Sequence, residues 1–168
     1  MTSAEREQRL RVATITVSDT RTESDDEGGK KLRDLLVLAG FDLGSHAIVR
    51  DEPSEVRAAI ERAADEGIEA IVTTGGTGIS PRDQTFEAVE SLLEKKLDGF
   101  GEAFRRLSWD AVGPRAILSR AVAGTFRGHV VIALPGSPLA LTLAVERIIG
   151  PILPHAVGLL SGRTRRHH

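Results

Sequence analysis

The 168-residue sequence has no cysteine, few aromatic residues and no marked excess of charge of either sign. The absence of cysteine excludes disulfides, thiolate metal sites and cysteine nucleophiles. A net charge of −2 with 4% aromatic residues argues against nucleic acid as a partner, because that role usually requires a basic excess and stacking rings. No apolar run approaches the ~20 residues that span a bilayer, and the N-terminus lacks a signal-peptide core. We therefore expect a cytoplasmic protein with no membrane partner.

The remaining composition is that of a globular chain. Forty per cent of the residues are apolar and 27% are charged, so the chain can bury a core without cross-links such as disulfides or metals. Its length corresponds to about one domain, at the usual ~100–200 residues per domain. We predict a single domain over residues 1–168, with an ordered core from about 11 to 161.

Strand and helix patterns alternate along the first half of the chain. Short β-branched runs predict strands at residues 12–17, 41–49 and 68–73, and amphipathic patterns predict helices at 28–39 and 53–66. Short connections between them imply right-handed βαβ units. The sequence therefore predicts an α/β fold with a mostly parallel sheet and helices on both of its sides.

The second half of the chain predicts an antiparallel addition to this sheet. Helical patterns cover residues 85–96 and 101–109. Residues 116–126 and 129–134 are predicted as two strands of a hairpin around Arg127-Gly128. The chain then ends in two predicted helices, 139–149 and 152–160, separated by Gly150-Pro151.

Four loops of small, hydroxyl and carboxylate residues follow predicted strands. They are Ser18-Asp19-Thr20, Asp51-Glu52, Gly75–Gly78 and Pro135-Gly136-Ser137. In an open parallel sheet, ligands bind beyond the carboxyl ends of the strands. We therefore expect these loops to meet at one edge of the sheet, called the rim below, and to form the functional site there.

The glycine-rich loop is the strongest local signal. Gly75, Gly76 and Gly78 remove side chains from a strand-to-helix turn, so that backbone N–H groups can approach a phosphate or another oxyanion. The hydroxyls of Thr74 and Thr77 add donors. No Walker A lysine follows, and the G-x-G-x-x-G spacing is absent. A tight turn without a ligand is the alternative interpretation.

Two carboxylates border this loop in the predicted fold. Asp83 either caps the following helix or holds a divalent cation beside a phosphate, and Asp51 is either a loop residue before Pro53 or the second ligand. Arg82 is either a phosphate clamp or solvated.

Other candidates for chemistry are weak. His46, His129 and His155 lack ligand-like spacing, and Ser137 lacks a G-x-S-x-G frame. Trp109 is predicted as a core or interface anchor rather than a stacking platform. The acidic run 25–27 is predicted to be a solvated loop.

Several short motifs follow one another between Val12 and Leu160. They are Thr16-Val17-Ser18-Asp19-Thr20, Thr73-Thr74-Gly75-Gly76-Thr77-Gly78, Arg82-Asp83, Gly99-Phe100-Gly101-Glu102, Leu118-Ser119-Arg120 and Leu134-Pro135-Gly136-Ser137. In this order and spacing they resemble the MoaB/MogA family of molybdenum-cofactor biosynthesis proteins, whose domain also occurs in gephyrin and the plant protein Cnx.

The resemblance implies a three-layer α/β/α domain that binds molybdopterin, a pterin carrying a dithiolene and a terminal phosphate. Adenylyltransferase members attach AMP to that phosphate from Mg-ATP and release pyrophosphate. The alternative is a MoaB-type protein that binds molybdopterin without this activity, as a carrier or scaffold. The resemblance also implies a homo-oligomer, trimer or hexamer, with other proteins of the cofactor pathway as further partners.

The resemblance also implies roles for individual residues. Asp51 and Asp83 are expected to be the catalytic residues and to hold Mg²⁺ with ATP. The expected ligand-binding residues are Ser18, Asp19, Thr74, Gly75, Gly76, Thr77, Gly78, Ser108, Ser119, Pro135, Gly136 and Ser137.

Overall fold

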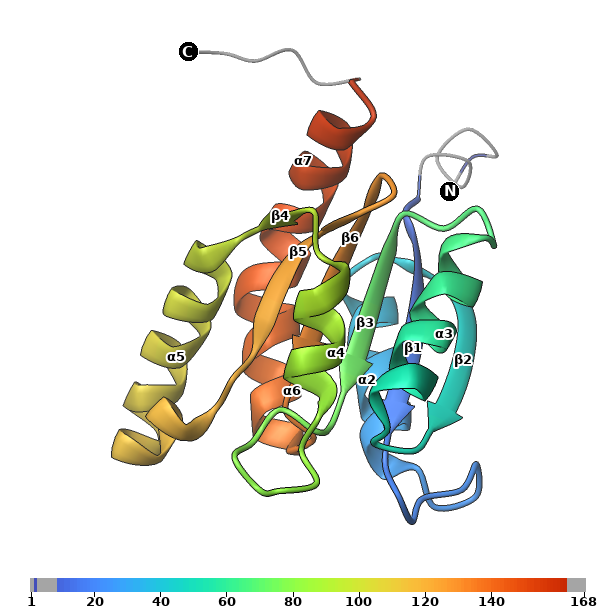
Figure 1. Ribbon diagram of the computed structural model, residues 1–168. Helices are drawn as coiled ribbons and strands as arrows, with labels where there is room; N and C mark the ends of the chain where they lie inside the picture. The colour runs from blue at the N-terminus through green and yellow to red at the C-terminus, as the bar shows by residue number, and fades with distance from the viewer. Residues whose placement is uncertain (1, 3–8, 163–168) are drawn as a thin grey trace.

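A six-stranded mixed sheet forms the centre of the computed structural model, which describes residue 2 and residues 9–162 (Figure 1). The strand order is β2-β1-β3-β6-β5-β4. The strands are β1 (Arg11–Val17), β2 (Asp42–Val49), β3 (Ala70–Thr74), β4 (Lys95–Lys96), β5 (Val122–Phe126) and β6 (His129–Leu134). Strands β2, β1, β3 and β6 are parallel, while β5 runs antiparallel to β6 and to β4. The predicted mostly parallel sheet with an antiparallel hairpin is confirmed.

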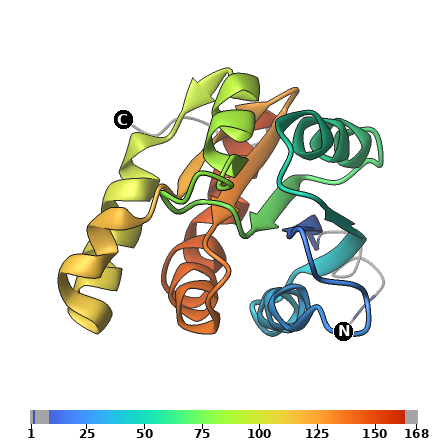
Figure 2. The ribbon, with the colours of Figure 1, turned by 60° about the horizontal axis from the view of Figure 1, so that its bottom comes forward.

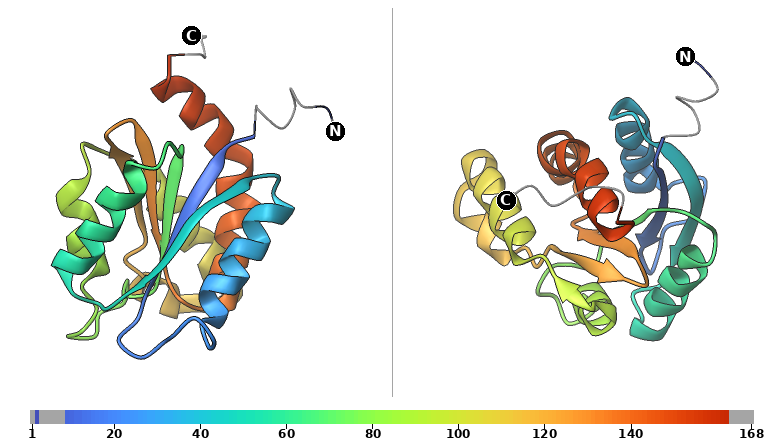
Figure 3. Two further views of the ribbon diagram at one scale, coloured as in Figure 1. Left: turned by 90° about the vertical axis from the view of Figure 1, so that its right-hand side faces the viewer. Right: turned by 90° about the horizontal axis from the view of Figure 1, so that it is seen from above.

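Helices cover both faces of this sheet and make a three-layer sandwich (Figure 3). The helices are α2 (Glu27–Leu38), α3 (Pro53–Ala64), α4 (Thr85–Leu92), α5 (Asp98–Val112), α6 (Pro138–Ala144) and α7 (Gly150–Leu160). One buried cluster joins α2, α5, α6 and α7 to the sheet, and a second joins α3 and α4 to its other face. Alternate residues of β1 enter the two clusters, Val12 the first and Ala13 the second. Burial on both faces explains the continuous apolar runs of the central strands.

The helix ends in the first half of the chain follow the local sequence. Asp26 is the N-cap of helix α2, and its side chain accepts a hydrogen bond from the Gly29 N–H. It ends before Gly40, which has a φ of +97°, as expected for a glycine just beyond a helix. Pro53 occupies the first turn of α3, and Gly67 (φ +71°) follows the end of that helix.

Two boundaries in the second half of the chain differ from the prediction. The helix predicted at 85–96 ends at Leu92, and Lys95–Lys96 form the edge strand β4 paired with β5. The strand predicted from residue 116 begins at Val122, because Gly113–Leu118 forms a 3₁₀ helix (η1) with Pro114 in its first turn. The first error arises because pairing with β5 at the sheet edge decides the conformation of Lys95–Lys96.

The predicted break at Gly150-Pro151 is also wrong. Residues from Pro138 to Leu160 form one continuous helix, in which the π-helical segment η2 (Val145–Ile149) joins α6 to α7. The Gly150 N–H donates to the Val145 carbonyl five residues earlier. This wider turn accommodates Pro151, which has no N–H and whose ring would clash in a regular helix.

One side of this long helix is part of the core. By length and composition alone its 23 residues suffice to cross a bilayer, a test that core helices also pass. Leu141, Val145, Ile149 and Leu153 are fully buried along one stripe and pack on the sheet and on α2. Ile152 and Leu159 of the same helix are apolar and exposed.

A buried polar network lies under the N-terminus of α2. The Asp26 carboxylate accepts hydrogen bonds from the Thr16 hydroxyl (2.8 Å) and from the Gly29 N–H (3.0 Å), and it contacts His46 Nε2 at 2.8 Å. His46 Nδ1 contacts the Thr14 hydroxyl at 2.7 Å. The prediction of a solvated 25–27 loop is therefore wrong at Asp26, which holds the β1–α2 connection to strands β1 and β2.

Candidate functional site

The four predicted loops meet at the carboxyl end of the parallel strands (Figures 1 and 2). The Gly75 N–H donates to the Leu134 carbonyl at 2.9 Å, and the Thr74 hydroxyl donates to the Pro135 carbonyl at 3.1 Å. On the other side, the Asp51 N–H donates to the Asp19 carboxylate at 3.1 Å. Direct hydrogen bonds thus join the loop after β3 to that after β6, and the loop after β1 to that after β2.

The glycines of the loop after β3 permit close packing at this rim. Gly75 and Gly76 have φ values of +102° and +73°, a region that L side chains rarely adopt. A Cβ at Gly75 would lie 2.3 Å from the Val17 carbonyl oxygen, and one at Gly76 would lie 2.1 Å from Thr85 Oγ1. The turn itself therefore requires glycine at these two positions.

The same loop also presents free backbone donors. Within the described part of the chain, no protein acceptor engages the N–H groups of Gly76, Thr77 and Gly78. Successive N–H groups in a glycine-rich turn form a concavity suited to an oxyanion. The loop therefore combines a structural turn with the donors that anion binding requires.

Asp51 and Asp83 flank this loop. Asp51 is only 6% exposed, accepts a hydrogen bond from the Gln84 N–H (3.0 Å), and has Oδ2 2.6 Å from the Cβ position of Gly76. Asp83 Oδ2 lies 2.8 Å from the Cβ position of Gly78 and accepts a hydrogen bond from the Ser80 N–H. The helix-cap interpretation of Asp83 is wrong, because Gln84 occupies the N-cap of α4.

The electrostatics of this pair favour a bound cation. Burial raises the pKa of Asp51, and the nearby carboxylates of Asp83 and Asp19 raise it further. Among the described residues, no group of three or more His, Cys, Asp or Glu side chains is arranged to hold a metal ion. Mg²⁺ commonly binds through one or two carboxylates together with phosphate oxygens. Two carboxylates beside an anion loop fit that donor set, with the remaining oxygens coming from the ligand and water.

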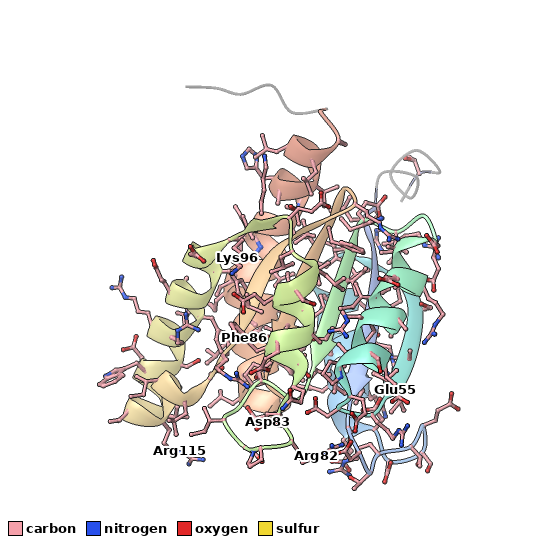
Figure 4. All side chains as sticks on the ribbon, viewed as in Figure 1. Glu55, Arg82, Asp83, Phe86, Lys96 and Arg115 are labelled. Carbon is pink, nitrogen blue, oxygen red and sulfur yellow. The ribbon has the colours of Figure 1, made fainter. Side chains whose placement is uncertain are left out.

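The Arg82 side chain is 58% exposed, and its guanidinium is paired with two carboxylates. Its guanidinium donates two hydrogen bonds to Asp19 (3.0 and 3.1 Å) and one to Glu52 (3.0 Å). The hydrogen bond from Arg82 lowers the pKa of Asp19 below its ordinary value, and that from the Asp51 N–H acts in the same direction. Arg82, which Figure 4 shows at the tip of the loop beside Asp83, therefore links the loop after β3 to the loops after β1 and β2.

A pocket of about 380 Å³, lined mainly by apolar residues, opens beside the rim between α5, η1 and the start of α6. It brings together Ser108, Ser119, Pro135 and Ser137, four of the residues predicted to contact a ligand. The Ser108 hydroxyl donates to the Phe104 carbonyl at 2.9 Å, and Ser137 caps α6 by accepting from the Ala140 N–H. The buried Ser119 hydroxyl oxygen has no partner within the described residues. An apolar floor with a few hydroxyls is suited to a flat heterocycle.

Two other predicted residues, Ser18 and Gly136, take part in the rim. Ser18 accepts hydrogen bonds from the N–H groups of Thr20 and Arg21 and so shapes the first loop. The Gly136 carbonyl oxygen lies 3.5 Å from the Cβ position of Gly28, at the start of α2. Trp109 is 50% exposed on α5, so it is not a core anchor.

Sequence reasoning missed two residues of this region. Thr85 is fully buried beside Gly76 and Asp51, and its hydroxyl oxygen has no hydrogen-bond partner in the described chain. Arg120 donates to the carbonyls of Gly78 and Asp83. Arg120 belongs to a motif that the sequence already singled out, but no spacing rule connects it to a loop about forty residues away.

Comparison with known proteins identifies the family. A family model described as "Probable molybdopterin binding domain" matches residues 13–155. The chain belongs to this family. The MoaB/MogA resemblance of the motifs is thereby confirmed, and with it a place in molybdenum cofactor biosynthesis.

Relatives of both MoaB and Mog type share this fold. The chain is 44% identical to molybdenum cofactor biosynthesis protein B of Staphylococcus aureus (strain COL) over 151 residues, which cover 88% of this chain and 90% of that protein. A crystal structure of a molybdenum cofactor biosynthesis protein B superposes with a TM-score of 0.89, at 40% identity and over 92% and 97% of the two chains. The molybdopterin biosynthesis Mog protein of Mycobacterium ulcerans superposes with a TM-score of 0.80, at 32% identity and over 91% and 98%.

Proposed function

We propose that this protein binds molybdopterin and transfers AMP from Mg-ATP to its terminal phosphate, with release of pyrophosphate. The observation that carries the proposal is the pair Asp51 and Asp83. An Asp51 carboxylate oxygen lies 2.6 Å from where a Cβ on Gly76 would be, and an Asp83 carboxylate oxygen lies 2.8 Å from where a Cβ on Gly78 would be. Both lie beside free backbone donors. Two carboxylates beside an anion loop are a donor set that commonly binds Mg²⁺ together with a polyphosphate.

The protein's part in this reaction is binding and orientation. An oxygen of the molybdopterin phosphate attacks the α-phosphorus of ATP, and the bond from that phosphorus to the oxygen of the departing pyrophosphate breaks. The attacking phosphate is already ionised, so no protein base is needed. Mg²⁺ held by Asp51 and Asp83 would neutralise charge on the phosphoryl oxygens. The N–H groups of the glycine loop orient one phosphate, and the pocket at Ser119 receives the pterin.

The decisive experiment is an adenylylation assay with molybdopterin, ATP and Mg²⁺. Wild-type protein is expected to release pyrophosphate and to form adenylylated molybdopterin. Asp83→Asn is expected to reduce turnover about 10²–10³-fold, the usual effect of removing one group that stabilises developing charge. Molybdopterin affinity in this variant is expected to stay within about twofold. Asp65→Asn, a change at the distant C-cap of α3, is the matched control. Full turnover by Asp83→Asn would remove Asp83 from the reaction.

A second candidate is a protein that binds molybdopterin without transferring adenylate. The greater identity to protein B relatives, 40–44%, than to the Mog protein, 32%, favours it. Such a protein is expected to bind molybdopterin equally well with and without ATP. Calorimetry with Mg-ATP distinguishes the two candidates, because only the transferase needs a nucleotide site.

We also propose that the protein is a cytoplasmic homo-oligomer, trimer or hexamer. Supporting this, an apolar groove of about 480 Å³ lies between α5 and α7. Exposed Leu97 and Ile152 line the groove, and Trp109 is exposed farther along α5. Apolar surface of this kind commonly marks an interface. Light scattering is expected to give three or six times the 18.0 kDa chain mass, and Ile152→Glu is expected to lower it. A monomeric wild type would refute this part of the proposal.

A further inference from the structure

Arg120 hydrogen-bonds the loop after β3 through both its backbone and its side chain. Its N–H donates to the Thr77 carbonyl at 2.9 Å. Its side-chain Nε donates to the Gly78 carbonyl at 2.9 Å, and Nη2 donates to the Asp83 carbonyl at 3.0 Å. One residue between η1 and β5 thus holds the loop at its beginning and at its end.

The guanidinium is itself fixed from two further sides. Its Nη1 donates to the Glu87 carboxylate on α4, and the hydrogen bond from Arg120 lowers the pKa of Glu87. The guanidinium carbon lies 5.1 Å from the centre of the Phe86 ring, which Figure 4 shows on α4 above the loop. The planar fork of arginine can make these bonds together, whereas the compact ammonium of lysine cannot.

A second arginine anchors the segment that carries Arg120. Arg105 on α5 donates to the carbonyls of Ser119 and Ala121, the two neighbours of Arg120 in the chain. A Cβ at Gly101 would lie 2.5 Å from a terminal nitrogen of Arg105, so this glycine gives the guanidinium its space. Helix α5, which lines the ligand pocket, is thereby connected through residues 119–121 to the loop that carries Asp83.

We propose that Arg120 is a positioning residue that holds the 77–83 loop, and with it the Asp83 carboxylate, in place beside Asp51. The functional half of this inference rests on the proposed adenylyl transfer, while the structural half does not. Arg120 acts through backbone carbonyls. Its loss is therefore expected to disturb Asp83 and the metal that this residue would hold, while leaving the apolar floor of the pterin pocket unchanged.

The structural half is tested by amide hydrogen exchange in Arg120→Lys, a variant that keeps the charge. The reporters are the N–H groups of Ser80, Asp83 and Gln84, which are hydrogen-bonded inside this region. We expect their exchange to be about 10-fold faster or more, because the loop loses hydrogen bonds from a charged group, which are stronger than those between neutral groups. Arg120→Met, which also removes the charge, is expected to show at least the same effect.

Arg127→Lys is the matched control. Arg127 also stacks on a phenylalanine, with its guanidinium carbon 4.8 Å from the Phe126 ring centre, but it lies in the β5–β6 turn at the opposite end of the sheet (Figure 1). Its substitution is expected to leave exchange at Ser80 and Asp83 unchanged. Equal exchange in wild type and Arg120→Lys would overturn the proposal, and so would equal acceleration by Arg127→Lys.

The functional half is tested by the Mg²⁺ dependence of turnover. In Arg120→Lys the Mg²⁺ concentration for half-maximal rate is expected to rise about tenfold, with KM for molybdopterin unchanged. Added to Asp83→Asn, the substitution is expected to have no further effect, because both changes remove the same function. A further loss in the double variant would show that Arg120 does not act through Asp83, and it would overturn the functional half. If wild-type protein shows no transfer, the proposed function fails, while the exchange result still decides the structural half.

Discussion

The substitution Gly76→Ala tests directly how this loop is built. Gly76 has a φ of +73°, and an added Cβ would lie 2.1 Å from Thr85 Oγ1 and 2.6 Å from Asp51 Oδ2. The left-handed backbone conformation alone costs an L residue roughly 1–2 kcal/mol. Overpacking of a close-packed site typically adds ~1–3 kcal/mol. We therefore expect Gly76→Ala to lower the free energy of unfolding by about 2–5 kcal/mol.

A matched glycine separates these two costs. Gly40 also has a positive φ, +97°, but a Cβ there meets no heavy atom within 4 Å. Gly40→Ala is therefore expected to show only the backbone cost. Urea denaturation at constant m-value measures both variants. The reasoning is refuted if the two substitutions destabilise the protein equally.

The identity of the clashing neighbour can be checked in the same series. Thr85→Ala removes the hydroxyl oxygen nearest to the added Cβ, an oxygen that has no hydrogen-bond partner in the described chain. The double variant Gly76→Ala, Thr85→Ala is expected to be about 1 kcal/mol more stable than the sum of the single changes predicts. Because the same Cβ also displaces Asp51, Mg-ATP affinity is expected to fall in Gly76→Ala and to be unchanged in Gly40→Ala.

Three further predictions concern buried polar groups. Burial raises the pKa of Asp51, so wild-type stability declines as pH rises from ~3.9 through that raised pKa. Asp51→Asn is therefore expected to raise the Tm at pH 7 without Mg²⁺ and to give no such gain near pH 3. The same variant is expected to lose stabilisation by Mg-ATP. Burial raises the pKa of Asp26, but hydrogen bonds from partners that include His46 outweigh it, so the pKa is lowered. The ionised Asp26 therefore stabilises the fold above pH ~3.9, and this stabilisation is lost as pH falls through the lowered pKa. Between pH 5 and 2, the free energy of unfolding of Asp26→Asn is expected to depend less on pH than that of wild type. Ser119→Ala removes a buried hydroxyl that has no partner within the described residues. The free energy of unfolding is therefore expected to change by less than ~0.5 kcal/mol, while molybdopterin affinity, measured by calorimetry, is expected to fall about tenfold. Unchanged affinity would exclude a contact between this hydroxyl and the ligand.

The predictions of secondary structure succeeded where the decisive contacts are local or follow from burial on both faces. The strand at 12–17 and the helix end before Gly40 are examples, since a β-branched run and a left-handed glycine carry their own preferences. The errors at Lys95–Lys96 and at Gly150-Pro151 have a different origin. There, pairing with β5 and a π turn in a helix packed on the sheet override the local signal.

The sequence by itself determined that four loops would meet at one rim, because parallel strands direct their carboxyl ends to the same edge of a sheet. It also determined the family, through motifs whose order spans almost the whole chain. Only the tertiary structure decided the partners of each side chain there: Arg82 with Asp19, Asp26 with His46, and Arg120 with the glycine loop. Those partners lie 20 to 63 residues apart in the chain, and a hydrogen bond requires atoms within about 3 Å. Sequence patterns indicate which face of a helix or which end of a strand a residue occupies. Atoms are placed to within hydrogen-bonding distance only after the helices and strands have packed.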